Sequence, residues 1–470
     1  MRVVDELFFP KGVCIVGASR DPQALGHIIL KNILSGGFSG HIYPINPRCE
    51  SLLGLRCYGS VKELPAVPDL AIVAVPAALV PSVIAECGEK GIPYAVIITA
   101  GFKETGERGA ELEREVLRIA REKGVRIVGP NCMGIYNSYN SLTATFTLMV
   151  PKKGNISFIS QSGAVGTTML AWAKKAGIGF SKFISIGNES DVSLSELLLY
   201  LSGDETTKVI TVYMESVKDG KAFLEALRRV SSNKPTIILK VGSTPAGAKA
   251  AASHTGAIAV ESSVLEGIFR QFSVIQARDT EELFELAHAF ASLPLPQGGS
   301  AAVVSSGGGW AIECADALES SGISLTPLPD SVVKELDALL PTYWSRRNPL
   351  DLVASINSEA YYQAVKLLME NDYDMIFLMG YGVLGSIAVP VAVDRDIEYA
   401  RKISALVHIH KKPIFVVDVL GEDLSECARV FKQKNLPVFR TVKSAVRVAS
   451  EMVRYSFRLR SRSKNLDLKG

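Results

Sequence analysis

Short apolar runs that end in small residues alternate with longer amphipathic stretches along the first part of the chain. The apolar runs predict strands, and the stretches between them, such as Arg108–Lys123, have the spacing of helices. The predicted strands are Val13–Gly17, His41–Asn46, Leu70–Val75, Tyr94–Thr99 and Arg126–Val128. This β-then-α alternation predicts a doubly wound parallel sheet, which binds ligands at the carboxyl ends of its strands.

The same pattern recurs twice more. Its strands are predicted at Asn155–Ser160, Lys208–Glu215 and Pro235–Val241, and then at Ala301–Val304, Met375–Met379 and Ile414–Val419. A linker is expected at Pro294–Gly299, and the polar, basic tail beyond Arg454 is expected to fray. We therefore expect an α/β fold of three doubly wound domains, at residues 1–151, 152–297 and 298–470. The length of 470 residues agrees with about three domains.

Composition narrows the function classes. The chain has 51 basic and 48 acidic residues, a balance that argues against nucleic-acid or membrane-surface binding through charge. Seven scattered cysteines without a C-x-x-C pair indicate a reducing compartment. The charged start predicts no signal peptide, and no apolar run approaches the ~18 residues of a membrane span. We expect a cytoplasmic protein.

The turns that follow the first set of strands are built from small residues and prolines. They read Gly17-Ala18-Ser19, Asn46-Pro47-Arg48, Val75-Pro76-Ala77, Thr99-Ala100-Gly101 and Pro130-Asn131-Cys132. Such turns let a flat or phosphorylated ligand approach the backbone, although each alone is an ordinary turn of an α/β domain. Ser19 replaces the second glycine of G-x-G-x-x-G, and no acidic residue follows the second strand, so NAD is disfavoured. Arg48 suits a phosphorylated ribose, as in CoA or NADP.

Two Gly/Ser turns stand where a strand meets a helix. Ser162-Gly163-Ala164 follows one strand, and Gly307-Gly308-Gly309 follows another. Helix starts of this kind present amide N–H groups and the positive end of the helix dipole, which suits a phosphate or an acyl oxyanion. Ser160 replaces the first glycine of G-x-S-x-G, which disfavours a nucleophilic serine. A plain tight turn at Gly307–Gly309 is the alternative.

A stretch of small residues, Val241–Val260, carries the candidate reactive group, His254. A neutral imidazole attacks phosphorus through one nitrogen, while a carboxylate orients the other. Glu215, at the end of a predicted strand, is the candidate orienting carboxylate. The alternatives are a capping or core histidine at His254 and a solvated carboxylate at Glu215. The other histidines have no ligand-like neighbours, and no metal site is expected.

The turns together resemble the α subunits of NDP-forming acyl-CoA synthetases, and among them the ADP-forming acetyl-CoA synthetases. The matching motifs, in chain order, are VGAS, INP, VPA, ITAGF, PNCMG, SQSGA, YMES, SHTGAIA and SSGGG. The likeness covers nearly the whole chain, and succinyl-CoA synthetases share the plan.

The resemblance implies a Rossmann-like CoA-binding domain followed by two flavodoxin-like ligase domains. It implies that phosphate displaces the thioester to give acyl phosphate and CoA, and that His254 then carries the phosphoryl group to ADP. Glu215 would steady the phosphohistidine, and the helix starts at Gly163 and Gly308 would cradle its phosphate. Mg-ADP or Mg-ATP would bind an ATP-grasp β subunit in an α₂β₂ assembly, with acetate as the usual acid.

One position departs from the pattern of the succinyl-CoA synthetases. Those enzymes carry Glu after Ile-Thr in the fourth turn, where this chain has Ala100, and Glu104 does not match by spacing. The carboxylate that assists acyl transfer is therefore left open. A CoA- or NADP-binding module without chemistry is the alternative to the ligase, and an NADP oxidoreductase is a third hypothesis.

Overall fold

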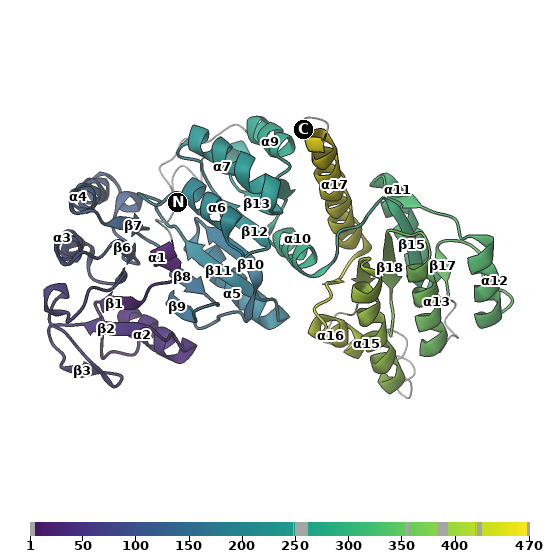
Figure 1. Cartoon of the computed structure of the whole chain (residues 1–470), viewed down its shortest axis with the longest axis horizontal. Coiled ribbons are helices and arrows are strands. Elements are labelled where there is room, and N and C mark those ends of the chain that lie inside the picture. Colours follow the sequence, from purple (N-terminus) through teal and green to yellow (C-terminus); the bar gives the residue numbers. More distant parts are fainter. Residues whose placement is uncertain are drawn as a thin grey trace. The chain divides into compact units, whose positions relative to one another are not determined.

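The computed structural model describes residues 5–247, 249, 262–352, 357–382, 393–418, 420 and 425–467. The chain divides into two compact units, Met1–Arg278 and Asp279–Gly470 (Figure 1). Among the described residues, the first unit holds two large sheets and the second unit holds one. The predicted α/β class with parallel sheets is confirmed. The expected domain limits of 1–151, 152–297 and 298–470 stay a prediction.

The first sheet is parallel throughout its described strands. Its strands are β1 (Gly12–Val16), β2 (His41–Ile45), β5 (Leu70–Val73), β6 (Tyr94–Ile97) and β7 (Arg126–Val128). Its helices are α2 (Leu25–Gly36), α3 (Val80–Lys90) and α4 (Glu107–Lys123), with 3-10 turns at Val61–Glu63, Ala77–Leu79 and Lys103–Thr105. The order β2-β1-β5-β6-β7 reverses direction after β2. Right-handed crossovers therefore place α2 on one face and α3 and α4 on the other, as Figure 1 shows.

Side chains of this sheet alternate between two cores, as the pleat requires. Val13 and Ile15 pack in a core with α2, whereas Cys14 and Val16 pack in a core with α3 and α4. The α2 core continues into the second sheet, where it includes Ile184. This shared core explains why the first two sheets form one unit.

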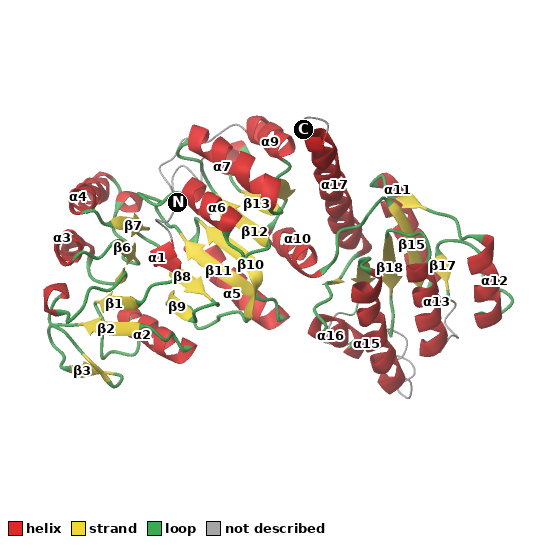
Figure 2. Ribbon diagram, viewed as in Figure 1, coloured by secondary structure: helices red, strands yellow, loops and turns green. Residues whose placement is uncertain are grey.

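The second sheet mixes parallel and antiparallel strands. They are β8 (Gly134–Asn137), β9 (Leu142–Thr145), β10 (Lys153–Ser160), β11 (Phe180–Ser185), β12 (Val209–Met214), β13 (Thr236–Lys240) and β14 (Ile275–Ala277). The helices are α5 (Gly163–Ala176), α6 (Leu194–Gly203), α7 (Gly220–Asn233) and α9 (Ser262–Phe272). In the order β14-β13-β12-β10-β11-β8-β9, β8 is antiparallel to both β11 and β9. Figure 2 shows α6, α7 and α9 grouped on one side of this sheet and α5 on the other.

The second unit repeats the doubly wound plan. Its strands are β15 (Ser300–Ser305), β16 (Ser324–Leu325), β17 (Leu350–Asp351), β18 (Met375–Met379), β19 (Ile414–Val417) and β20 (Val438–Phe439). Its helices are α10 (Thr280–Ser292), α11 (Gly308–Ser320), α12 (Asp330–Leu339), α13 (Ser358–Glu370), α15 (Val393–His410), α16 (Glu426–Gln433) and α17 (Val442–Asp467). The strand order is β16-β15-β18-β19-β20, and β17 pairs with β15. All described pairings in this sheet are parallel.

The tail beyond Arg454 was expected to fray, but it is helical, and α17 continues to Asp467. The middle of α17 packs into the second unit: Tyr455 is buried, and its ring meets the ring of Phe290 edge to face at 5.5 Å between centroids. Ser456 donates a hydrogen bond to the carbonyl of Pro296 at 2.7 Å. Apolar positions between the basic ones therefore keep the segment helical.

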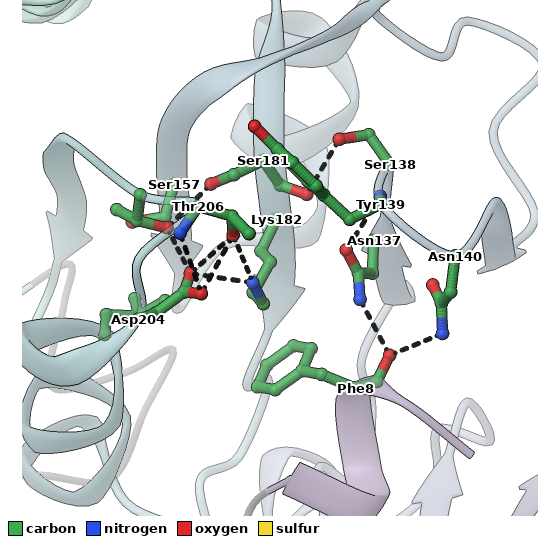
Figure 3. Close-up of polar contacts among 12 residues, drawn as sticks. Phe8, Asn137, Ser138, Tyr139, Asn140, Ser157, Ser181, Lys182, Asp204 and Thr206 are labelled. Atoms are coloured by element: carbon green, nitrogen blue, oxygen red, sulfur yellow. Dashed lines mark hydrogen bonds and ion pairs between the residues drawn. The ribbon is translucent and has the colours of Figure 1, made fainter.

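A buried ion pair fixes the start of the chain to the second sheet (Figure 3). The side chain of Lys182 on β11 is completely buried and donates to Asp204 at 2.7 Å and to Thr206 at 2.8 Å. Burial lowers the pKa of Lys182. Burial tends to raise the pKa of Asp204, but the hydrogen bond from Lys182 outweighs it and holds the pKa of that carboxyl below its usual value.

The short helix α1 (Asp5–Phe8) lies against this pair. The ring of Phe8 stacks on that of Tyr200 at 5.0 Å, and its carbonyl accepts hydrogen bonds from Asn137 and Asn140, both at 2.8 Å. The ammonium of Lys182 lies 5.9 Å from the centre of the Phe8 ring. The ion pair and the aromatic contacts thus hold α1 together with β8 and β11.

Lys182→Met is expected to destabilise the protein by about 3–5 kcal/mol, because it leaves the Asp204 carboxylate buried without its partner. Chemical denaturation at neutral pH measures the loss. Arg118→Ala is the matched control: it removes an exposed pair with Glu122 and should cost about 0.5 kcal/mol or less. Equal losses in the two variants would contradict a stabilising role for the buried pair.

Candidate functional site

The predicted turns of the first sheet lie along one edge, since all the strands before them are parallel. Hydrogen bonds join neighbouring turns. The side-chain amide of Asn46 donates to the carbonyl of Ala18 at 2.6 Å, and the hydroxyl of Thr99 donates to the carbonyl of Val75 at 2.7 Å. The amide of Asn131 donates to the carbonyl of Thr99 at 2.9 Å. The structure therefore brings the predicted cofactor-binding turns together.

Gly17 shows why the first turn needs glycine. Its φ is +93°, and an added Cβ would lie 2.3 Å from the carbonyl oxygen of Ala74. A side chain is therefore excluded both by backbone conformation and by space. The turn is correspondingly close to its neighbour after β5.

Cys132, also predicted to bind cofactor, turns its thiol into the core. The side chain is 4% exposed, and the thiol donates to the carbonyl of Ile97 at 3.3 Å. Burial raises the pKa of this thiol to about 12. A ligand at this turn would meet the backbone of Cys132 rather than a thiolate.

The two predicted helix starts share one local structure. Ser160 ends β10; its hydroxyl donates to the carbonyl of Ser162 at 2.7 Å and accepts from the amide of Ser162 at 3.2 Å. Ser305 ends β15 and makes the same two bonds with Gly307, at 2.7 and 3.1 Å. Both turns lead directly into a helix of more than three turns, whose first amides point toward the turn.

The residues after each start differ. Ser162 caps α5 by accepting from the amide of Val165 at 3.4 Å, and Gly163 lies against Met133. Gly308 lies against a carboxylate, since a Cβ there would be 2.9 Å from an Asp351 oxygen. The two starts therefore differ at the cap position, where α5 has Ser162 and α11 has Gly307, while Gly163 and Gly308 both lie against a neighbouring side chain.

Gln161, between β10 and α5, holds the turn that carries Glu215. Its Oε1 accepts from the amide of Glu215 at 2.5 Å and from that of Ser216 at 2.9 Å. Its Nε2 donates to the carbonyl of Ser216 at 3.0 Å and to the carboxylate of Glu189 at 2.8 Å. The predicted Glu215 is half-buried at the end of β12, and this side chain fixes its backbone.

Glu189 completes the link from the next strand. It is 6% exposed, and its other oxygen accepts from the amide of Leu194 at 2.7 Å. Burial raises the pKa of this carboxyl. The turns after β10, β11 and β12 are thereby joined through two side chains.

Asn188 connects these turns to the first sheet. Its side-chain amide donates to Glu104 at 2.7 Å and to Glu113 at 2.8 Å. Its backbone carbonyl accepts from the ammonium of Lys103 at 2.6 Å. Lys218 also donates to this carbonyl. Burial, together with repulsion from Lys103, lowers the pKa of Lys218 to about 8.

Glu104, whose role the sequence left open, supports a turn. Its carboxylate accepts from the amides of Gly101 and Phe102 at 2.6 and 3.0 Å. Burial opposes ionisation, but the hydrogen bonds from Asn188 and these amides hold the pKa of Glu104 below its usual value. Glu104 is thus an ionised anchor of the turn that contains Ala100.

A small cavity of about 20 Å³ lies among these side chains, room for about one water molecule. It is lined by Lys103, Asn131, Gln161, Gly187, Asn188, Glu189, Ser216 and Lys218. Of these, sequence analysis predicted only Asn131. Gln161 stands directly before a predicted site residue, and its position was a usable signal. Asn188 and Glu189 follow β11, a strand that the apolar pattern did not predict.

His254 lies outside the described residues, as does most of its small-residue stretch. Glu215 and the helix starts are therefore described without it. No group of metal-ligating side chains occurs within the part of the chain that the structure describes. Across those same residues, no helix is both long and apolar enough to cross a membrane.

Comparisons with known proteins match both sheets of the first unit. A CoA-binding domain model matches residues 11–138, and a model of the succinyl-CoA ligase-like flavodoxin domain matches residues 153–290. The first match covers the sheet with the small-residue turns, and the second covers the sheet that carries Ser162 and Glu215. Together they define a CoA-binding protein of the acyl-CoA ligase class.

Relatives along the whole chain narrow the class. The chain is 39% identical over 452 residues to the α subunit of acetate–CoA ligase (ADP-forming) II from Pyrococcus furiosus, covering 96% of this chain and 97% of the relative. Identity to the α subunit of isoform I from that organism is 34% over 460 residues, covering 96% and 98%. The chain belongs to the family of ADP-forming acetate–CoA ligase α subunits.

A solved structure supports the same assignment. Acetyl-coenzyme A synthetase 1 from Ca. Korarchaeum cryptofilum, solved in complex with phosphate and ADP, matches with a TM-score of 0.89 and 34% identity over 98% of both chains. The ligase interpretation is therefore confirmed over a non-catalytic CoA- or NADP-binding module.

Gln161→Leu is expected to speed hydrogen exchange at the amides of Glu215 and Ser216, because both lose their acceptor. The loss should also destabilise the protein by about 1–3 kcal/mol. Exchange measured by mass spectrometry or NMR, with denaturation in parallel, tests this. Thr168→Val, which removes a hydroxyl from the exposed face of α5, is the control. Unchanged exchange at 215 and 216 would show that Gln161 does not hold the turn.

Proposed function

We propose that the chain converts acyl-CoA and phosphate to acyl phosphate and CoA, and then carries the phosphoryl group on His254. A phosphate oxygen attacks the thioester carbonyl, and the carbon–sulfur bond breaks to release CoA. A ring nitrogen of His254 next attacks phosphorus and releases the carboxylic acid. The phosphoryl group finally leaves nitrogen for ADP. The observation that carries this proposal is the family membership, combined with two helix starts of the same local structure.

Glu215 is the proposed orienting carboxylate for the His254 ring. A carboxylate that accepts from one ring nitrogen fixes the tautomer and stabilises the cation formed at phosphorylation. Gln161 supports this role because it fixes the Glu215 backbone. Glu104 is a turn anchor rather than a proposed participant.

The starts of α5 and α11 are the proposed phosphate sites. Ser162, Gly163 and Ala164 form one, and Gly307, Gly308 and Gly309 form the other. Amide N–H groups and the helix dipole stabilise a bound phosphate by about 0.3–2 kcal/mol per helix end. A phosphoryl group on His254 would use these groups in turn.

CoA is proposed to bind the turn edge of the first sheet. The residues are Gly17, Ala18, Ser19, Asn46, Pro47, Arg48, Val75, Pro76, Thr99, Ala100, Gly101, Asn131 and Cys132. The exposed guanidinium of Arg48 would pair with the phosphate on the ribose of CoA. The cross-linked turns supply the preformed backbone that such a ligand needs.

The nucleotide, ADP or ATP, is proposed to bind a partner subunit. Mg-ADP or Mg-ATP would lie on an ATP-grasp β subunit, in an α₂β₂ assembly located in the cytoplasm. The α-subunit names of the relatives support a partner. Acetate is the proposed acid, because both relatives are acetate–CoA ligases. The division into a CoA-binding region and two ligase regions, with limits at 151 and 297, accompanies this proposal.

Substituting His254→Asn should abolish acid-labile, base-stable labelling by radioactive acetyl phosphate while leaving CoA affinity unchanged within about twofold. Asparagine cannot form the phosphoramidate, and the proposed CoA turns, which belong to the first sheet, are unchanged by the substitution. His408→Asn, at an exposed position of α15, is the matched control and should label normally. Full labelling of the His254 variant, or CoA binding without any labelling of the native chain, would refute the phosphohistidine.

Replacing Arg48→Ala should weaken CoA binding by about tenfold or more, the expected loss for a charge-assisted hydrogen bond of 1.5–3 kcal/mol. Dephospho-CoA lacks the ribose phosphate, so the native chain and the Arg48→Ala variant should bind it with the same affinity. Calorimetric titration with both ligands gives the comparison, and Arg56→Ala, on the nearby hairpin, serves as control. An equal loss for both ligands would place Arg48 elsewhere in the site.

A further inference from the structure

Two cysteines face each other beside the predicted CoA-binding turn. Cys49 Sγ and Cys57 Sγ lie 3.2 Å apart. They flank a hairpin formed by β3 (Ser51–Leu52) and β4 (Leu55–Arg56), which leaves the first sheet after β2 (Figure 1). A disulfide needs an S–S distance of about 2.05 Å, so the sulfurs would have to approach by only about 1 Å.

The hairpin itself is well defined. Ser51 pairs with Arg56 and Leu52 with Leu55, and the two turn residues Leu53 and Gly54 both have positive φ, as a tight hairpin turn requires. At its base the amide of Cys57 donates to the carbonyl of Glu50 at 2.8 Å. This ladder places Cys57 across from Glu50, the residue next to Cys49, so the two cysteines are diagonal neighbours in the folded chain.

The two thiols differ in environment. Cys49 is half-buried, whereas Cys57 is 7% exposed. Burial, followed by the contact with Cys49, raises the pKa of Cys57 to about 12. Cys49 donates to the carbonyl of Ser51 at 3.0 Å, which leaves Cys57 as the donor toward the Cys49 sulfur. Cys49 is the less buried of the two residues, so a reagent in solution reaches it before Cys57.

The other five cysteines lie in the protein core. Cys14, Cys87, Cys132, Cys314 and Cys427 are all buried, with exposures of 4% or less. Among the seven cysteines, all of which lie within the described residues, only Cys49 is half-buried rather than buried, and its neighbour Cys57 is at contact distance.

We propose that Cys49 and Cys57 form a thiol–disulfide exchange site that reacts with low-molecular-weight disulfides. The Cys49 thiolate attacks one sulfur of the reagent disulfide, forming a mixed disulfide and releasing one thiolate. Cys57 then loses its proton and attacks the Cys49 sulfur, forming the Cys49–Cys57 disulfide and releasing the second thiolate. Two protein thiols are oxidised, the reagent is reduced to two thiols, and these take up the two protons.

The product would cross-link the base of the hairpin next to Arg48. The amide of Asn46 already donates to the carbonyl of Tyr58, the residue after Cys57, at 2.9 Å. Oxidation would therefore add a covalent tie to a turn that is now joined to its hairpin by hydrogen bonds. Exchange with a dithiol reductant would reverse it.

Incubation of the full chain with oxidised glutathione tests the proposal. Thiols counted after denaturation should fall from seven to five, and peptide mapping should find Cys49 linked to Cys57. Cys57→Ser should instead hold one glutathione on Cys49, because the resolving thiol is gone. Cys49→Ser should keep its six remaining thiols, since Cys57 is buried and protonated. Dithiothreitol should restore the seven thiols of the native chain.

The asymmetry between the two variants is the critical result. Seven thiols retained by the native chain, a disulfide mapped to any other pair, or equal modification of both variants would overturn the proposal. Thermal melts of both serine variants, set beside that of the reduced native chain, verify folding. If either variant melts early, Cys49→Ala and Cys57→Ala replace it in the same thiol count, with the same expected asymmetry.

Discussion

A single side-chain amide, that of Gln161, joins the ends of three neighbouring strands in the second sheet. It satisfies two backbone N–H groups after β12 and a carboxylate after β11, and it does so from the end of β10. Buried polar groups are costly when they lack partners, so the three turns are stable only in this mutual arrangement. The position of Glu215 follows from this constraint, and through Asn188 the same network reaches the CoA-binding sheet.

The starts of α5 and α11 show that one local solution is used in both units. A serine at the last position of a strand closes a turn by bonding twice to the residue two positions later. A helix begins directly after the turn, and the backbone amides of its first residues are free of intrahelical hydrogen bonds. The first helical residue of each start is a glycine beside a side chain, Met133 at α5 and Asp351 at α11, whereas the cap residue differs between Ser162 and Gly307.

Sequence analysis predicted the five strands of the first sheet and, in the other two sheets, β10, β12, β13, β15, β18 and β19, since buried apolar runs between small residues have few other interpretations. It missed β11, whose serines and Lys182 interrupt the apolar pattern although the strand is fully buried. It also missed β8 and β9, which contain threonines, a tyrosine and an asparagine with local partners. Because Asn188 and Glu189 follow a missed strand, their place in the site was not predictable from motif order. The structural role of His254 stays a prediction.

The β8–β9 hairpin also bears on how the chain can be divided for separate expression. By position these strands follow the CoA-binding strands, but by pairing they extend the second sheet beyond β11. Asn32 on α2 donates to the carbonyls of Thr145 and Thr147 at 2.7 and 2.9 Å, so the hairpin also covers a helix of the first sheet. A fragment that ends near residue 151 would contain the β8–β9 hairpin without β11, so β8 would lose its pairing partner. A fragment that ends before the hairpin would leave α2 exposed to solvent. Both truncations break contacts between the two sheets, so we expect the two sheets to fold as a single unit.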